Sequence, residues 1–105
     1  MAFWKQPKGT KQKEKRARRA AVEREYNRVR LIVLERDGGI CRICGGGFGI
    51  QVHHIQFRSA GRIDTTANLI AICANCNDAI HVTRAIVVTG DGDGALQVTR
   101  TREAV

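Results

Sequence analysis

Two short motifs, Cys41-Arg-Ile-Cys44 and Cys73-Ala-Asn-Cys76, decide how this chain of 105 residues folds. A chain of this length suffices for one domain, but it buries proportionately less surface than a larger protein and benefits from a staple. Each Cys-x-x-Cys turn places two sulfurs at the separation that tetrahedral zinc requires, and four thiolates leave no open coordination position. The motifs therefore predict one closed, structural zinc site.

Two disulfides and a redox-active cysteine pair are the alternative interpretations. Disulfides persist in oxidising compartments. The chain begins with a lysine-rich segment that lacks the apolar core of a signal peptide, and no run is long enough to span a membrane, so we expect an intracellular protein with reduced thiols. A thioredoxin-like pair belongs to a βαβ pattern, which surrounds neither motif. The pattern favours zinc.

Positive charge is concentrated at the start of the chain. Residues 1–36 hold 12 Lys/Arg against 4 Asp/Glu, and residues 37–105 hold 6 of each, so the whole net charge of +8 lies in the first segment. Such a segment can bind a phosphate backbone through counterion release, whereas a solvated tail is the alternative. We expect a flexible basic arm over residues 1–18, too polar to bury a core, and one domain over residues 19–105. The candidate nucleic-acid contacts in the arm are Lys11, Lys13, Lys15, Arg16, Arg18 and Arg19.

Apolar periodicity predicts the helix before the first cysteine motif. Val22, Tyr26, Val29 and Val33 share one face of a helix over residues 20–36. Asp-Gly-Gly follows at residues 37–39, and a glycine just past a helix end adopts the left-handed conformation without steric cost. The helix is therefore expected to end at residue 36.

The remaining elements follow from shorter patterns. Alternating apolar residues predict a strand over residues 48–54, and the apolar run at 69–72 predicts its partner across a polar loop. Residues 74–82 are expected to form a helix. Residues 86–88 and 96–98 predict a second hairpin, whose Gly-Asp-Gly-Asp-Gly tip requires positive φ. The order indicates an α+β fold with an N-terminal helix and a C-terminal β-hairpin.

A second candidate site involves histidines in and after the long interval between the cysteine pairs. His53 and His54 are adjacent on the predicted strand and therefore point to opposite faces, so that one can bind metal while the other faces substrate. Asn77 and His81 are four residues apart on the predicted helix and share a face. Phosphodiester hydrolysis needs a base and a cation, which this set can supply. A pair of hydrogen-bonded loop histidines is the alternative interpretation.

Together the motifs resemble the HNH endonucleases over residues 29–82. The residues that carry the resemblance are Cys41-x-x-Cys44, His53-His54, Asn68-Leu69, Cys73-x-x-Cys76-Asn77 and His81. The resemblance implies the small ββα-metal fold, in which a hairpin and a helix bind one divalent cation and cut DNA.

The resemblance also implies a role for each residue. His54 is the general base that activates water, His53 and Asn77 bind the catalytic cation, and His81 is the third ligand. Asn68 hydrogen-bonds backbone across the wide loop and so holds the base in position. The family frequently has histidine in place of Asn77. An amide oxygen is a harder ligand than imidazole, so Mg²⁺ or Mn²⁺ is expected ahead of Ni²⁺ or Zn²⁺.

Two functions are compatible with these residues. The first is a DNA endonuclease that hydrolyses phosphodiester bonds with one metal, aided by phosphate contacts from Arg58 and Arg62 unless these loop arginines are only solvated. The second is a zinc-stabilised nucleic-acid-binding module that does not cut. Gln51 and Asp64 are lesser site candidates. Family context suggests phage packaging, restriction or mobile elements, with the phage protein acting in the host cytoplasm, and the residues do not select among them.

Overall fold

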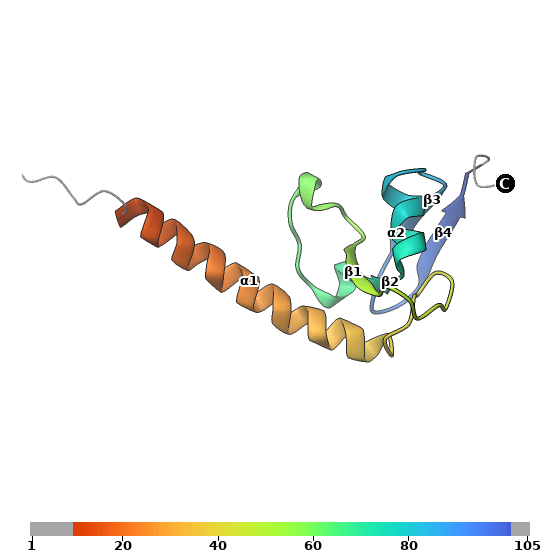
Figure 1. Cartoon of the computed structure of the whole chain (residues 1–105), viewed down its shortest axis with the longest axis horizontal. Coiled ribbons are helices and arrows are strands. Elements are labelled where there is room, and N and C mark those ends of the chain that lie inside the picture. Colours follow the sequence, from red (N-terminus) through yellow and green to blue (C-terminus); the bar gives the residue numbers. More distant parts are fainter. Residues whose placement is uncertain (1–9, 102–105) are drawn as a thin grey trace, which may run out of the picture.

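The computed structural model describes residues 10–101. Its elements are helix α1 (Thr10–Arg36), strands β1 (Gln51–His54) and β2 (Leu69–Ile72), helix α2 (Ala74–His81), and strands β3 (Ile86–Gly90) and β4 (Leu96–Arg100) (Figure 1). Two 3-10 turns, η1 (Arg58–Ala60) and η2 (Thr66–Asn68), lie in the loop between β1 and β2. The predicted α+β order is confirmed: a ββα unit stands between an N-terminal helix and a C-terminal hairpin. In the part that the structure describes, no helix combines the length and apolar character needed to cross a membrane.

Strand β2 lies at the centre of the fold, and all four of its residues are buried. Leu69 packs with Val29 and Val33 of α1, whereas Ile70 and Ile72 pack in a second cluster with residues of α2 and β3. A strand that is covered on both faces is apolar at every position, which explains the unbroken run of this segment. β2 therefore joins α1 on one side to α2 and the second hairpin on the other.

Helix α1 begins earlier than expected. We predicted disorder up to residue 18, but the helix starts at Thr10, and the rest of that expected arm, residues 1–9, lies outside the described residues. Residues 11–22 are exposed on every side, and Figure 1 shows this half of the helix projecting beyond the other elements. Lys, Arg, Glu, Gln and Ala are strong helix formers, and they extend a helix whose packed C-terminal half supplies the nucleus.

The first strand is shorter than predicted. Phe48 was expected to begin a strand over residues 48–54, but β1 begins only at Gln51, and the side chain of Phe48 is 83% exposed. Gly49 has a φ of 63° and turns the chain, and the carbonyl of Phe48 accepts a hydrogen bond from the amide of Ala74 at the start of α2. The backbone before β1 therefore forms a hydrogen bond with the start of α2 and does not extend the pairing with β2.

A buried carboxylate connects the end of α1 to the first cysteine motif. Asp37 accepts hydrogen bonds from the guanidinium groups of Arg36 and Arg42 at 2.8–3.0 Å and from the amide of Ala71 at 2.9 Å. Burial raises the pKa of Asp37, but the hydrogen bonds from Arg36, Ala71 and Arg42 outweigh it, so the pKa lies below its ordinary value. The network fixes α1, the Cys41 turn and β2 to one another.

The tip of the second hairpin differs from our expectation. Only Gly90, with a φ of 110°, has the positive φ that we predicted for the glycines of this tip. Gly92 is instead required by close packing: its amide donates to the carbonyl of Ala67 at 2.7 Å, and a Cβ added there would lie 2.6 Å from the carbonyl oxygen of Leu69. The tip is thus docked on the loop that precedes β2.

Replacing Gly92 with alanine is expected to destabilise the fold by about 1–3 kcal/mol, because the new methyl group overlaps backbone atoms that cannot move independently. The matched control is Gly94→Ala, for which the nearest atom would be 3.9 Å from the added Cβ. Thermal unfolding measures both. A Gly92→Ala protein with the melting temperature of the Gly94→Ala protein would contradict the docking described here.

Candidate active site

The four cysteines come together as predicted. Their sulfur atoms all lie within 4.8 Å of one another, and those of Cys44 and Cys73 are 3.5 Å apart. Four sulfurs bound to one tetrahedral zinc at about 2.3 Å would be about 3.8 Å apart, so the cluster has the dimensions of a zinc site. Cys41, Cys73 and Cys76 are buried, and Cys44 is exposed at the rim.

Backbone amides prepare these sulfurs to bind a cation. The amides of Ile43 and Cys44 lie 3.4 and 3.5 Å from the sulfur of Cys41, and the sulfur of Cys73 caps α2 by accepting from the amide of Cys76. Burial raises the pKa of Cys41, but hydrogen bonds from the amides of Cys44, Cys73 and Ile43 outweigh it and lower the pKa to about 6. Burial and the neighbouring thiols raise the pKa of Cys76. A donor set of four sulfurs, one of them readily ionised, fits zinc.

His53 and His54 point to opposite faces of the β1–β2 hairpin, as expected. His53 pairs with Ile70, which packs toward α2, and His54 pairs with Leu69, which packs toward α1. Side chains of directly paired residues share a face of the sheet. The hairpin therefore presents His53 to α2 and His54 to α1.

His53, Asn77 and His81 line one pocket of about 350 Å³, together with His54. Nε2 of His81 lies 3.4 Å from Nδ1 of His53. Two nitrogens that bind one ion at 2.0–2.1 Å are roughly 2.9 Å apart in an octahedral site and about 3.4 Å apart in a tetrahedral one, so the facing rings are close enough to bind one cation. Asn77 is half-buried on the same helix as His81 and contributes a polar group to this pocket.

The environment of His53 keeps its imidazole neutral. Burial, followed by the charges of His81 and His54, lowers its pKa to about 4. A neutral imidazole has a free lone pair, which is the form that binds metal. The ring also contacts Phe57 edge-on, with centroids 5.8 Å apart. His53 is thus held in a state in which it can accept a cation.

His54 lies on the other face in a buried polar contact. Its Nε2 is 2.7 Å from Oδ1 of Asp64, and its ring stacks on Tyr26 of α1 with centroids 5.7 Å apart and planes 11° from parallel. Burial raises the pKa of Asp64, but hydrogen bonds from His54 and Arg62 outweigh it and hold the pKa below its ordinary value. Asp64, which the sequence suggested only as a lesser candidate, is therefore an ionised partner of His54.

Asn68 makes the loop-spanning hydrogen bonds that the resemblance implies. Its Oδ1 accepts from the amide of Gln56 at 2.8 Å, and its Nδ2 donates to the carbonyls of Gln56 and Ile63 at 3.3 and 2.9 Å. The amide of Ile55 also donates to the carbonyl of Asn68 at 2.8 Å. Asn68 thereby closes the wide loop next to the histidine pair.

The two loop arginines differ in their surroundings. Arg58 lines the pocket of His53, and its side chain is 55% exposed. Arg62, expected as a phosphate contact, instead donates to Asp64 at 2.7 Å and to Glu23 at 2.8 Å and lies over the ring of Tyr26. Nη2 of Arg58 lies 3.9 Å from Oε1 of Glu23, a long ion pair that leaves the Arg58 side chain largely exposed, whereas Arg62 is engaged inside the protein. The basic residues predicted as nucleic-acid contacts are all exposed on α1: Lys11, Lys13, Lys15, Arg16, Arg18 and Arg19.

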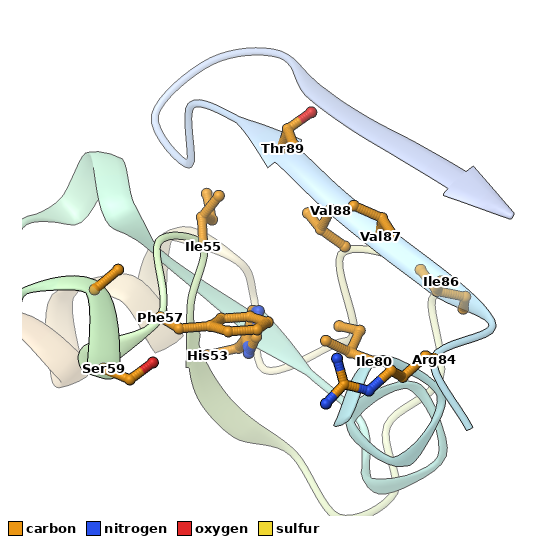
Figure 2. A pocket seen from close by; sticks show the side chains of 11 residues that line it. His53, Ile55, Phe57, Ser59, Ile80, Arg84, Ile86, Val87, Val88 and Thr89 are labelled. Atoms are coloured by element: carbon orange, nitrogen blue, oxygen red, sulfur yellow. The ribbon is translucent and has the colours of Figure 1, made fainter. Parts of the chain in front are cut away.

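An apolar cavity of about 390 Å³ adjoins the metal pocket on the side of the second hairpin. Figure 2 shows His53 and Phe57 side by side, facing β3, with Val88 and Ile86 on that strand. His53 and Phe57 line both hollows. A mostly apolar hollow therefore lies next to the candidate metal site.

The sequence did not reveal three contacts of this site. Tyr26 was expected only as a core residue of the helix, and Glu23 only as a polar residue on another face. Phe57, which lies 5.1 Å from His81 between ring centroids, had no signal beyond its place beside Arg58. These contacts join segments far apart in the chain, so local patterns could not have predicted them.

The chain is similar to proteins that cut DNA. The family model of HNH endonucleases matches residues 41–83. The Type IV methyl-directed restriction enzyme EcoKMcrA of Escherichia coli (strain K12) is 31% identical over 88 residues, which cover 75% of this chain and 32% of the relative. The chain thus spans about a third of that relative's length. No solved structure matches the chain.

The matched segment holds the four-cysteine cluster, both histidines of β1 and the two polar residues of α2 that face them. These matches support a nuclease-type function at the level of the family. Neither the structure nor the relative bears on the phage setting that the resemblance suggested. Residues 41–83 of the chain carry the match to the HNH endonuclease family.

Proposed function

We propose that this chain hydrolyses phosphodiester bonds of DNA, with His54 as the general base and one divalent cation held by His53, Asn77 and His81. The observation that carries the proposal is the shared pocket of these four side chains, in which the facing nitrogens of His53 and His81 are 3.4 Å apart. An HNH domain and a restriction enzyme among the relatives support DNA as the substrate.

In this mechanism a water molecule enters the pocket beside His54 and attacks the phosphorus. The unprotonated nitrogen of His54 accepts a proton from that water as the new P–O bond forms and the bond to the departing oxygen breaks. His53, Asn77 and His81 would hold a divalent cation, which would supply charge neutralisation at the phosphate and the departing oxygen. Asn68 holds the loop, and Arg58 donates to a phosphate oxygen of the bound strand.

The four-cysteine cluster has a structural role in this proposal. A zinc ion bound by four sulfurs has no open position for substrate, so it takes no part in the chemistry. Cys73 begins α2 and Cys76 lies on its first turn, and the same helix carries Asn77 and His81. Zinc thus sets the position of two catalytic-cation ligands. We place the protein inside the cell, where thiols stay reduced.

Nicking of supercoiled plasmid tests this function. The zinc-loaded chain is incubated with DNA and Mg²⁺, Mn²⁺ or Ni²⁺, and the control omits the added metal, because a chelator would also remove the zinc. Open circles are expected with at least one metal and none without it. A mobility shift is measured in parallel, and DNA binding without nicking under every metal would favour the binding-module alternative.

The exposed half of α1 is proposed as the phosphate-binding element. Lys11, Lys15 and Arg18 lie on one face, and each phosphate contact contributes about 0.9 to the slope of log affinity against log salt. Replacing all three with glutamine is expected to weaken DNA binding and to reduce that slope by about 2–3. Arg28→Gln is the control, because Arg28 already pairs with Glu25 at 2.6 Å. Equal slopes in the two variants would contradict this role.

A further inference from the structure

We propose that Asp64 is a positioning residue for His54 and that helix α1 holds this pair in place. The inference rests on the proposed function, in which His54 is the base. It gives a defined role to Asp64, which the sequence offered only as a lesser candidate, and connects it to helix α1, which precedes the family match at residues 41–83.

The contact between His54 and Asp64 selects one form of the imidazole. Nε2 of His54 is 2.7 Å from Oδ1 of Asp64, and both side chains are largely buried, at 7% and 13% exposure. An ionised carboxylate only accepts hydrogen bonds, so the proton of the neutral ring resides on Nε2. Nδ1 is then the nitrogen with a free lone pair, and it is the atom that can accept a proton from water.

Asp64 is itself held by a second residue. Its other oxygen, Oδ2, accepts from Nε of Arg62 at 2.7 Å, and Nη1 of Arg62 donates to Glu23 of α1 at 2.8 Å. These contacts form a continuous chain from His54 through the loop to the helix. Because both oxygens of Asp64 are engaged, the carboxylate has one orientation relative to the ring that it orients.

Tyr26 closes this arrangement from the side of α1. Its ring stacks on His54, and the guanidinium of Arg62 lies over the Tyr26 ring with Cζ 5.2 Å from the centroid. Among the described residues, Nη2 of Arg62 is buried without a hydrogen-bond partner. A buried donor without a partner costs free energy. The conformation of Arg62 is therefore maintained by its other contacts and not by hydration of the guanidinium. The position of the guanidinium is set by Asp64, Glu23 and the aromatic ring together.

The physical role follows from the geometry that proton transfer requires. A base misplaced by about 1 Å loses roughly 100-fold in rate, and a carboxylate bonded to the far nitrogen of a histidine fixes both the tautomer and the ring orientation. Asp64 touches neither water nor phosphate in this scheme and acts only through His54. Glu23 and Tyr26, which support the pair, lie before the family match, so the helix is part of the working site.

Asp64→Ala tests the inference. We expect kcat for plasmid nicking to fall roughly 100-fold at saturating metal, with KM for DNA and Mn²⁺ binding little changed, because the cation ligands and basic residues remain. Thr65→Ala is the control: it lies next to Asp64 on the same loop, is exposed, and makes no side-chain hydrogen bond to cap η2. Its kcat should match that of the wild type. Circular dichroism and zinc content establish that both variants are folded.

Nitrogen NMR of the His54 ring provides a readout independent of cutting. The wild-type ring is expected to carry its proton on Nε2, and Asp64→Ala is expected to give a mixture of the two tautomers. A wild-type ring protonated on Nδ1, or an Asp64→Ala protein with unchanged kcat and tautomer, would overturn the inference. Failure of the wild type to cut with any metal would overturn the proposed function instead, and the NMR result would still decide the orientation of His54.

Tyr26 is tested by a pair of substitutions. Tyr26→Phe keeps the ring that stacks on His54, whereas Tyr26→Ala removes it. Tyr26→Phe is therefore expected to retain the Nε2 tautomer, and Tyr26→Ala to give a mixture of the two tautomers. Equal behaviour of the two folded variants would show that α1 does not hold the pair.

Discussion

Cys41→Ser is expected to unfold the domain. Structural zinc in small domains contributes on the order of 10 kcal/mol to folding at neutral pH, which is comparable to the whole stability of a typical domain at about 5–15 kcal/mol. Only a small apolar core would remain, since two clusters on either side of β2 make up the interior. Loss of far-ultraviolet circular dichroism and of bound zinc measures the effect.

Cys44→Ser separates loss of zinc from loss of core packing. Cys41 is 2% exposed and packs in the apolar cluster, whereas Cys44 is exposed at the rim. If packing alone were responsible, Cys44→Ser would be nearly silent. If zinc is responsible, both variants unfold. A Cys44→Ser protein that keeps its fold without zinc is the result that would contradict a stabilising metal.

His54→Ala is expected to lower the rate of DNA nicking by about 10²–10⁴-fold, the range that a positioned general base contributes. The substitution removes the proton acceptor but leaves His53, Asn77 and His81 in place. Binding of DNA and of the catalytic cation should therefore persist. Single-turnover nicking at saturating DNA and metal measures the chemical step without interference from product release.

The outcome depends on keeping the fold intact, because His54 is buried against Tyr26 and Leu69. Its removal leaves a cavity, so zinc content and thermal stability must be measured beside activity. His54→Gln provides a second variant that fills more of this space and still cannot serve as the base. Full-rate nicking by either folded variant would exclude His54 from proton transfer.

Much of the framework could be predicted because its signals are local in the chain. The spacing of Cys41 and Cys44 predicts a metal turn, and the alternation that leads to His53 and His54 predicts a strand with the two rings on opposite faces. The apolar run at residues 69–72 predicts the strand β2 that pairs with β1. Where local signals were weak, the prediction was wrong. Phe48 lies outside β1 and bonds to the start of α2, and residues 10–18 belong to helix α1 and not to a flexible arm.

The rest of the site could not be predicted because it depends on how distant elements pack. The contact of His54 with Asp64 requires the wide loop to fold back over β1, and the stacking of Tyr26 requires α1 to cross beside the hairpin. Gly92 is a similar case, since its need for space comes from the carbonyl of Leu69 and not from its own φ. These contacts join residues that are far apart in the chain, so no regular spacing in the sequence indicates them.

We propose that this chain binds a divalent cation at His53, Asn77 and His81 in addition to the zinc ion of the four-cysteine cluster. Titration of the zinc-loaded protein with Mn²⁺, followed by the electron paramagnetic resonance of free Mn²⁺, tests it most directly. We predict one bound Mn²⁺ per chain in the wild type and in His54→Ala, and binding at least roughly 10-fold weaker in His81→Ala, because losses even of outer contacts of a metal ligand weaken binding by that factor. A wild type that binds no Mn²⁺, or equal binding in all three proteins, would contradict the account.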